Sequence, residues 1–261
     1  MTQAAHVDYL LRLGDSSLVM GQRLAEWTGH GPVLEEDIAM SNIALDLLGQ
    51  ARLLLTHAGR LEGAGRDEDA LAYWRDARAY RNYTLCELPN SGIEKGRTQS
   101  GCYGVTMVRN LFFCGFQSLL WTELAQSRDE ELAAIAAKSA KETAYHLRHA
   151  SDWVVRLGDG TDDSHARAQR AVGQLYPYTN EFFVTDPVEE ELVAAGIAPR
   201  GADLRDAWQA LIGRVCDEAT LVLPAPAKFA STGKSGLHSE HLDYLLAEMQ
   251  CVARAHPGAT W

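Results

Sequence analysis

Carboxylate and imidazole side chains at helical spacing are the residues of this sequence best suited to bind a metal. Glu142 and His146 are four residues apart, as are Glu26 and His30. Each pair would place two ligand groups on one face of a helix. The alternative for such a pair is an internal hydrogen bond or ion pair, which we favour because buried charges are commonly paired with one another.

A di-iron site in a helical bundle requires more than these pairs. It uses two Glu-x-x-His motifs and two further glutamates from separate helices. The 261-residue sequence contains no Glu-x-x-His. Its nearest approach is Asp162-x-x-His165, in a glycine-rich stretch typical of a loop that leads into a helix N-terminus. The sequence therefore predicts the scaffold of a metalloenzyme that has lost its metal.

Asp46 lies among apolar residues, where the second long helix would carry its Glu-x-x-His. The sequence has Asp-x-x-Gly there, ending at Gly49. Glycine supplies no donor atom, so at most one ligand remains. We interpret Asp46 as the partner of a buried arginine in preference to a metal ligand.

A basic and aromatic cluster lies between residues 75 and 83. Guanidinium groups and aromatic faces suit phosphates and an adenine ring. The more common arrangement is a solvated helix face, whose arginines would here pair with Asp67, Glu68 and Asp76. The cluster consists of Arg75, Arg78, Tyr80, Arg81, Asn82 and Tyr83.

Apolar residues at spacings of three and four predict an all-α fold. The helix at about 35–61 has apolar residues on two faces, and we expect both faces to be buried. The helices at about 101–126 and 129–157 place Glu123, Glu142 and His146 on their core-facing stripes. The expected helices span about 6–28, 35–61, 67–86, 101–126, 129–157, 163–184, 202–220 and 239–255.

Composition narrows the class of protein. The 24 basic and 35 acidic residues give a formal charge of −11, which disfavours nucleic acid or an anionic membrane as the main partner. The five cysteines show no Cys-x-x-Cys spacing, which disfavours a zinc site or a disulfide framework and fits a reducing cytoplasm. The start of the chain does not resemble a secretory signal. The most apolar stretch, 105–121, is interrupted by polar residues and is expected to be a buried core helix.

Stretches from the first helix to the C-terminal region resemble the C-subunit family of the bacterial phenylacetyl-CoA 1,2-epoxidase (ring-oxygenase) complex. Together these strings are highly specific. They are Leu11–Asp15, Gly21–His30, Asn42–Arg52, Ala137–Arg148, Gly158–Asp162, Gly236–His241 and Leu246–Gln250.

The resemblance implies a single ferritin-like domain over residues 1–261, with a four-helix core of about 6–158 and added helices over about 159–261. It also implies a non-catalytic structural subunit that forms a stable subcomplex with a homologous di-iron A subunit. A small B subunit and an NADPH-dependent reductase with flavin and iron–sulfur groups would complete the complex. The expected role is cytoplasmic, in aerobic phenylacetate degradation, with no cofactor in this chain.

The resemblance also implies residue roles. Phenylacetyl-CoA would lie near the contact between the A and C subunits. This makes a part of the basic cluster the candidate substrate-side surface, namely Arg78, Tyr80, Arg81 and Asn82. The candidates for a vestigial metal site are Glu26, Asp46, Glu123, Glu142 and His146.

A rival hypothesis makes the chain an enzyme in its own right. The five vestigial-site candidates would then assemble an atypical, carboxylate-rich di-metal site that activates oxygen. A ferritin-type site normally has two histidines, and this core offers one well-placed candidate, His146. We therefore prefer the structural subunit, whose interface would be formed by apolar helix faces left over after the bundle core has closed.

Overall fold

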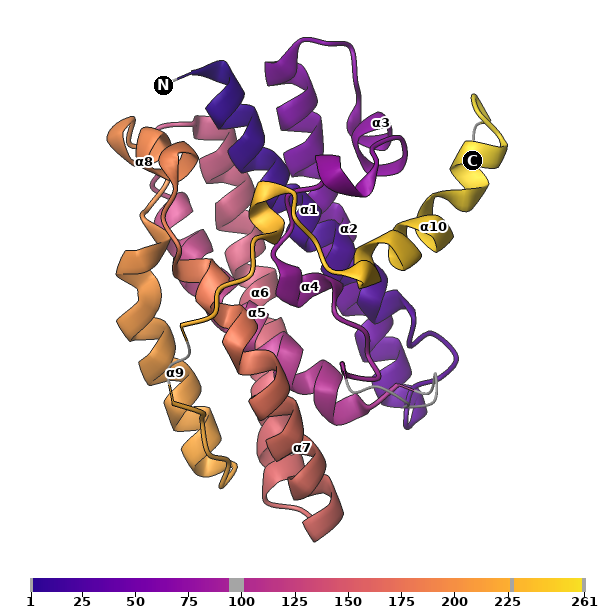
Figure 1. Cartoon of the computed structure of the whole chain (residues 1–261), viewed down its shortest axis with the longest axis vertical. Helices are drawn as coiled ribbons and strands as arrows, with labels where there is room; N and C mark the ends of the chain where they lie inside the picture. Colours follow the sequence, from indigo (N-terminus) through magenta and orange to yellow (C-terminus); the bar gives the residue numbers. More distant parts are fainter. Residues whose placement is uncertain (1, 94–100, 226–227, 260–261) are drawn as a thin grey trace. The chain divides into compact units, whose positions relative to one another are not determined.

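The computed structural model describes residues 2–93, 101–225 and 228–259, which form ten α-helices and four short 3₁₀ helices (Figure 1). No strand occurs in these ranges beyond one isolated bridge between Thr232 and Leu237. The all-α prediction is confirmed, and the helices are consistent with a ferritin-like bundle. The chain divides into two compact units, residues 1–88 with 232–261, and residues 89–231.

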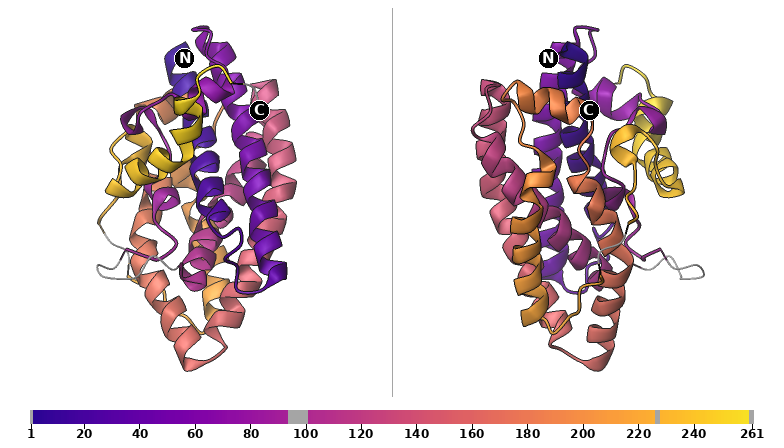
Figure 2. Two further views of the ribbon diagram at one scale, coloured as in Figure 1. Left: turned by 90° about the vertical axis from the view of Figure 1, so that its right-hand side faces the viewer. Right: turned by 60° about the vertical axis from the view of Figure 1, so that its left-hand side comes forward.

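The first unit is built on two long helices, α1 (Gln3–Ala25) and α2 (Leu34–Glu62), which lie side by side in both views of Figure 2. They run antiparallel, because Gly14 of α1 approaches Leu55 of α2 while Gly21 approaches Ala44. A Cβ atom on Gly14 would lie 2.9 Å from Leu55 Cδ2. Glycine therefore permits the close approach of the two helices. The shorter helices of this unit are α3 (Glu68–Tyr73), η1 (Ala77–Ala79), α4 (Thr84–Glu87), η4 (Gly233–Ser235) and α10 (Glu240–Ala255).

The second unit is built on the pair α5 (Tyr103–Leu124) and α6 (Glu130–Gly158). Asp129 begins α6 by accepting hydrogen bonds from the backbone N–H groups of residues 131 and 132, a standard N-cap. Trp208 of α9 lies at the centre of an aromatic cluster and donates its indole N–H to the carbonyl of Phe112 on α5, at 3.1 Å. The remaining elements are α7 (Asp162–Leu175), η2 (Tyr176–Phe183), α8 (Pro187–Ala194), η3 (Gly201–Leu204) and α9 (Arg205–Glu218).

Two expected helices are wrong in their extent. The helix expected over 67–86 is three short pieces, because the backbone N–H of Arg81 and the guanidinium of Arg75 both bind the Asp15 carboxylate and hold this segment in a turn. The helix expected over 163–184 ends at Leu175. Pro177 follows, and a proline has no N–H to continue the α-helical ladder.

The expectation that α2 is buried on both faces is also wrong. One face is buried, through Met40, Ile43, Leu47 and Leu54. The other face leaves Leu34, Ile38 and Leu45 exposed, at 71%, 52% and 65%. By length and composition α2 is the one described helix that passes a test for a membrane span, a test that core helices of water-soluble proteins also pass. The expected burial of 105–121 within α5 is confirmed.

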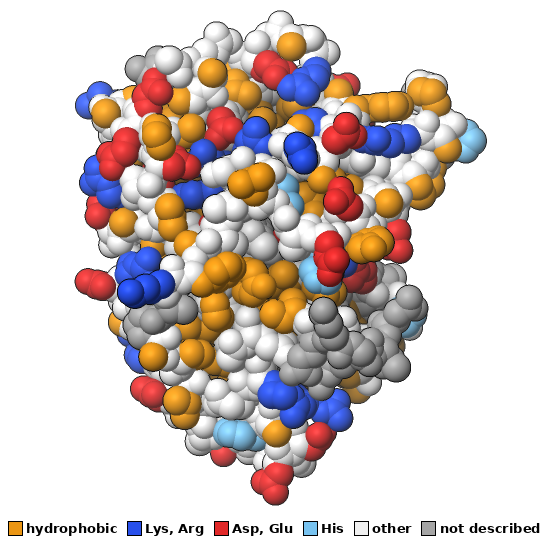
Figure 3. Space-filling view, viewed as in Figure 1, with side chains coloured by type: hydrophobic (Ala, Val, Ile, Leu, Met, Phe, Trp, Pro, Cys, Tyr) orange, Lys and Arg blue, Asp and Glu red, His pale blue; other side chains and the backbone are white. Residues whose placement is uncertain are grey.

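Charged side chains are mixed in sign over the face drawn in Figure 3. Acidic and basic groups alternate there, with apolar side chains between them. The acidic residues are therefore not concentrated on this face. A surface with both signs interspersed does not produce the strong electrostatic field that steers a highly charged partner.

Candidate functional site

A metal site in the second unit would be formed by the buried, facing sides of α5 and α6, which we call the inner stripes. The register of the two helices follows from the rings of Tyr103 and Trp153, which meet edge to face with centroids 5.1 Å apart. Seven residues further along each antiparallel helix, almost two full turns, Asn110 is level with His146. After fourteen residues Gln117 is level with Ser139. With this register, the buried polar side chains on the two helices include amides, a hydroxyl and the imidazole of His146.

These polar groups are buried. Gln117 is 2% exposed and Ser139 is 1% exposed. Neither amide atom of Gln117 has a hydrogen-bond partner among the described residues, and the same holds for Ser139 Oγ, Asn110 Oδ1 and Trp121 Nε1. Buried polar groups are normally paired, so these atoms depart from the usual pattern. Asn110, Gln117 and Ser139 were not among the predicted site residues, although polar residues on otherwise apolar helix faces are a readable signal in the sequence.

The carboxylates predicted for this unit do not join the stripe. Glu123 is exposed near the end of α5. Glu142 is half-buried and forms an ion pair with Lys138 of its own helix at 2.8 Å. His146 is buried at 1% exposure and is the one predicted vestigial-site residue that reaches the interior of this unit. The α5–α6 pair thus lacks a buried carboxylate to accompany the imidazole.

The first unit does not supply a carboxylate site from the predicted residues either. Glu26 caps the end of α1 and forms an ion pair with Arg23 at 2.6 Å, with 30% of its side chain exposed. Asp46 is half-buried on α2, and Gly49, one turn further on, adds no donor. Amides, hydroxyls and single carboxylates do not fit a di-iron centre, which needs several carboxylates and two imidazoles.

The buried carboxylates of the first unit are Asp15 and Glu87, which sequence analysis did not select. Asp15 is fully buried and bound by both terminal nitrogens of the Arg75 guanidinium, one of them at 3.0 Å. The positive charge of Arg75 compensates the negative charge of Asp15. The ion pair holds the segment after α3 against α1. The signal in the sequence that could have indicated the burial of Asp15 was its position as an acidic residue among apolar residues of the first helix.

Glu87 is the second buried carboxylate, at 0% exposure. Its oxygens accept hydrogen bonds from Asn82 Nδ2 at 2.9 Å, from the backbone N–H of Ser239 at 2.6 Å and from His238 Nδ1 at 2.8 Å. His238 Nε2 lies 3.0 Å from the carbonyl of Tyr80. The cluster joins α4 to the segment before α10, and we interpret it as structural because three donors converge on the Glu87 carboxylate.

The predicted substrate-side residues divide into two kinds. Tyr80 and Asn82 are fully buried, so their side chains are part of the scaffold. Burial and the negative charge of Asp15 raise the pKa of Tyr80, which keeps the hydroxyl protonated. Arg78 is exposed, and Arg81 is half-buried and ion-paired with Asp8 at 2.9 Å. A ligand-binding role for this segment stays a prediction. Among the four residues, only Arg78 and Arg81 have side chains that reach solvent and could contact a ligand.

Two of the three arginines of the basic cluster are paired with the first helix. Arg75 binds Asp15 and Arg81 binds Asp8, whereas sequence analysis had expected the acids at positions 67, 68 and 76. Helix α1 supplies both acids because the turn after α3 brings the chain back across it. The cluster is therefore tied to the core of its unit.

Comparison with known proteins agrees with the residues that carried the family resemblance. The family model for the phenylacetic acid catabolic protein matches residues 1–261. The C subunit of the 1,2-phenylacetyl-CoA epoxidase of Escherichia coli (strain K12) is 46% identical over 253 residues. The match covers 97% of this chain and 98% of that protein.

Proposed function

Because the chain belongs to the phenylacetic acid catabolic protein family, we propose that it is the structural C subunit of a phenylacetyl-CoA epoxidase. It binds and stabilises a homologous catalytic A subunit, without turning over substrate itself. The A subunit holds the di-iron centre, a small B subunit and a flavin and iron–sulfur reductase complete the complex, and the assembly works in cytoplasmic phenylacetate degradation.

The observation that carries the non-catalytic role is the donor set of the helix pairs. The α5–α6 pair offers Gln117, Ser139 and Asn110 at its inner stripe, with His146 as the one imidazole from the predicted set. Of the candidate carboxylates, Glu123 is exposed, Glu26 and Glu142 are ion-paired, and Asp46 is half-buried on α2. Oxygen activation accordingly belongs to another chain.

The exposed face of α2 is the surface we assign to the partner. Leu34, Ile38 and Leu45 follow one another at spacings of four and seven, so they form one stripe. Covering such a stripe removes apolar area from water, and each large side chain contributes about 1.5–3 kcal/mol when fully buried. A permanent interface of this kind buries well above about 1,200 Å².

Coexpression with a tagged catalytic subunit tests the interface. Ile38→Glu and Leu45→Glu each place a charge in the stripe, and we expect either to reduce copurification more than tenfold. Val222→Glu is the matched control, since Val222 is 71% exposed and lies in the second unit. Equal recovery of all three variants would remove α2 from the interface.

Metal analysis and turnover test the catalytic assignment. Separated subunits are assayed for iron and manganese, and the isolated chain is supplied with reductase, oxygen and phenylacetyl-CoA. We expect no stoichiometric iron or manganese in this chain and no epoxide without the A subunit. Two tightly held ions and turnover by the isolated chain would instead establish the rival enzyme hypothesis.

A contribution to binding the CoA ester is a further part of the proposal. Arg78 is exposed and available to a phosphate, while Arg81 also holds Asp8. Arg78→Ala is therefore the cleaner variant, with Arg81→Ala as the second. The role is wrong if both variants leave the apparent KM of the complex for phenylacetyl-CoA unchanged.

A further inference from the structure

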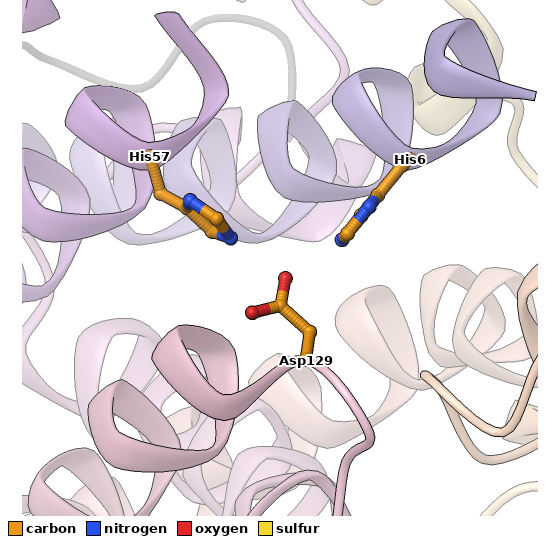
Figure 4. Close-up of side chains that lie close together, drawn as sticks. All are labelled: His6, His57 and Asp129. Atoms are coloured by element: carbon orange, nitrogen blue, oxygen red, sulfur yellow. The ribbon is translucent and has the colours of Figure 1, made fainter. Parts of the chain in front are cut away.

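Two buried histidines face one another across the α1–α2 pair. His6 lies in the first turns of α1 and His57 lies near the end of α2. Figure 4 shows their rings directed toward a shared space. The ring centroids are 5.9 Å apart and the ring planes lie at 88° to one another. Asp129, also labelled there, belongs to the second unit.

The separation of the rings is close to that of two imidazoles sharing one ion. With Zn–N distances of about 2.0–2.1 Å and a tetrahedral angle, the two nitrogens are about 3.3 Å apart and the ring centroids about 5.2 Å apart. One ligand nitrogen of His6 lies within 4.8 Å of one of His57. A closing movement of less than about 1.5 Å, within reach of side-chain rotation, completes the geometry.

We propose that His6 and His57 form a binding site for a single late transition-metal ion, Zn²⁺, Ni²⁺ or Cu²⁺, which joins the start of α1 to the end of α2. Neutral imidazole nitrogens favour these ions over Mg²⁺, Ca²⁺ or Mn²⁺, which prefer oxygen ligands. Each histidine is 7% exposed, so the site is shielded but open enough for an ion to enter. Water completes the coordination of the bound ion.

The site is separate from the proposed role as a structural subunit. It uses residues of one helix pair, and none of them belongs to the predicted vestigial-site set. An ion that binds the folded state but not the unfolded state stabilises the folded state by mass action. We call the bound ion a clip, because it would link the two helices. Loss of the bound ion leaves the polypeptide fold in place. The metal site can therefore be disproved without disproving the structural-subunit function, and the reverse also holds.

Titration of the full-length chain with Zn²⁺ tests the proposal. Calorimetry of the chelator-treated protein should give one ion per chain, and its Tm should rise with the Zn²⁺ concentration. His6→Gln and His57→Gln should each weaken binding more than tenfold and remove the rise in Tm. His30→Gln is the matched control, because His30 is an exposed histidine of the same unit.

The spectrum of bound Co²⁺ adds a measurement that does not depend on stability. Imidazole coordination gives visible d–d bands, which should be present in the parent chain and absent from both variants. Saturable binding with unchanged affinity in His6→Gln and His57→Gln would mean adventitious binding elsewhere and would overturn the proposal. Failure of the parent chain to bind Zn²⁺, Ni²⁺ or Cu²⁺ would overturn it as well.

Discussion

His238 and Glu87 form a buried pair in which the histidine Nδ1 lies 2.8 Å from the carboxylate Oε2. The other ring nitrogen of His238 lies 3.0 Å from the carbonyl oxygen of Tyr80, so each of these two contacts is to an oxygen acceptor. Donation to both oxygens requires two N–H groups on the ring, and the contact with Glu87 is an ion pair when His238 is protonated. The pair fastens the segment before α10 to α4.

Removing the charge of Glu87 tests this attachment. Glu87→Gln keeps the size of the side chain but replaces a buried carboxylate that accepts from three donors with an amide, and we expect a loss of about 1–3 kcal/mol of unfolding free energy. His238→Gln retains a donor for the carboxylate and should cost less. Urea unfolding of both variants and of the double variant measures the coupling. Additive losses would show that the two side chains do not interact.

The end of α6 packs so closely that only glycine fits at position 158. A Cβ there would lie 2.2 Å from the carbonyl oxygen of Ala219. Gly158→Ala should therefore cost about 1–3 kcal/mol by overpacking. Gly213→Ala is the control in α9, where the added methyl has open space and should stabilise the helix by about 0.5–1 kcal/mol. The same sign for both variants in equilibrium unfolding would contradict the packing.

The buried amide of Gln117 is a source of instability. Because neither of its polar atoms has a partner among the described residues, Gln117→Met should stabilise the chain by about 1 kcal/mol. Gln250→Met is the matched control. Its Nε2 donates to two backbone carbonyls and to the Tyr80 hydroxyl, so the substitution should destabilise by about 1–3 kcal/mol. Destabilisation of similar size in both variants would mean that Gln117 is paired.

The cysteines should differ sharply in reactivity. Burial raises the pKa of Cys114 to about 12, and burial with the charge of Asp217 raises that of Cys216 to about 11. Only the thiolate reacts, so these two thiols should resist iodoacetamide at pH 8. Cys251 is exposed and Cys102 is half-buried, and both should be alkylated in the native protein, as peptide mass spectrometry can measure.

The same pKa shifts set the sign of a pH effect on stability. Above the ordinary thiol pKa of about 8.5, the unfolded chain releases protons that folded Cys114 and Cys216 retain. Unfolding is then favoured, and stability should fall as the pH rises from about 8.5 toward 11. A double Cys→Ala variant should lose this part of the pH dependence. An identical pH profile in the variant would contradict the assignment.

The sequence by itself determined the helices and the family. Apolar spacing located the four long helices, because a side chain's face on a helix depends only on its position along the chain. The absence of a Glu-x-x-His motif could also be seen in the sequence, because that motif is defined by local spacing alone. The strings from Leu11 to Gln250 carried the family, which the match over residues 1–261 confirmed.

Only the tertiary structure decided which faces are covered and which charges are paired. Periodicity marks Leu34, Ile38 and Leu45 as one apolar face, but whether a neighbour covers that face depends on helices elsewhere in the chain. Glu87 and His238 are 151 positions apart, so no local spacing connects them. The burial of Tyr80 and Asn82 likewise follows from the return of the chain across α1. Helical period is a local property of the chain, whereas burial and pairing are set by contacts between distant segments.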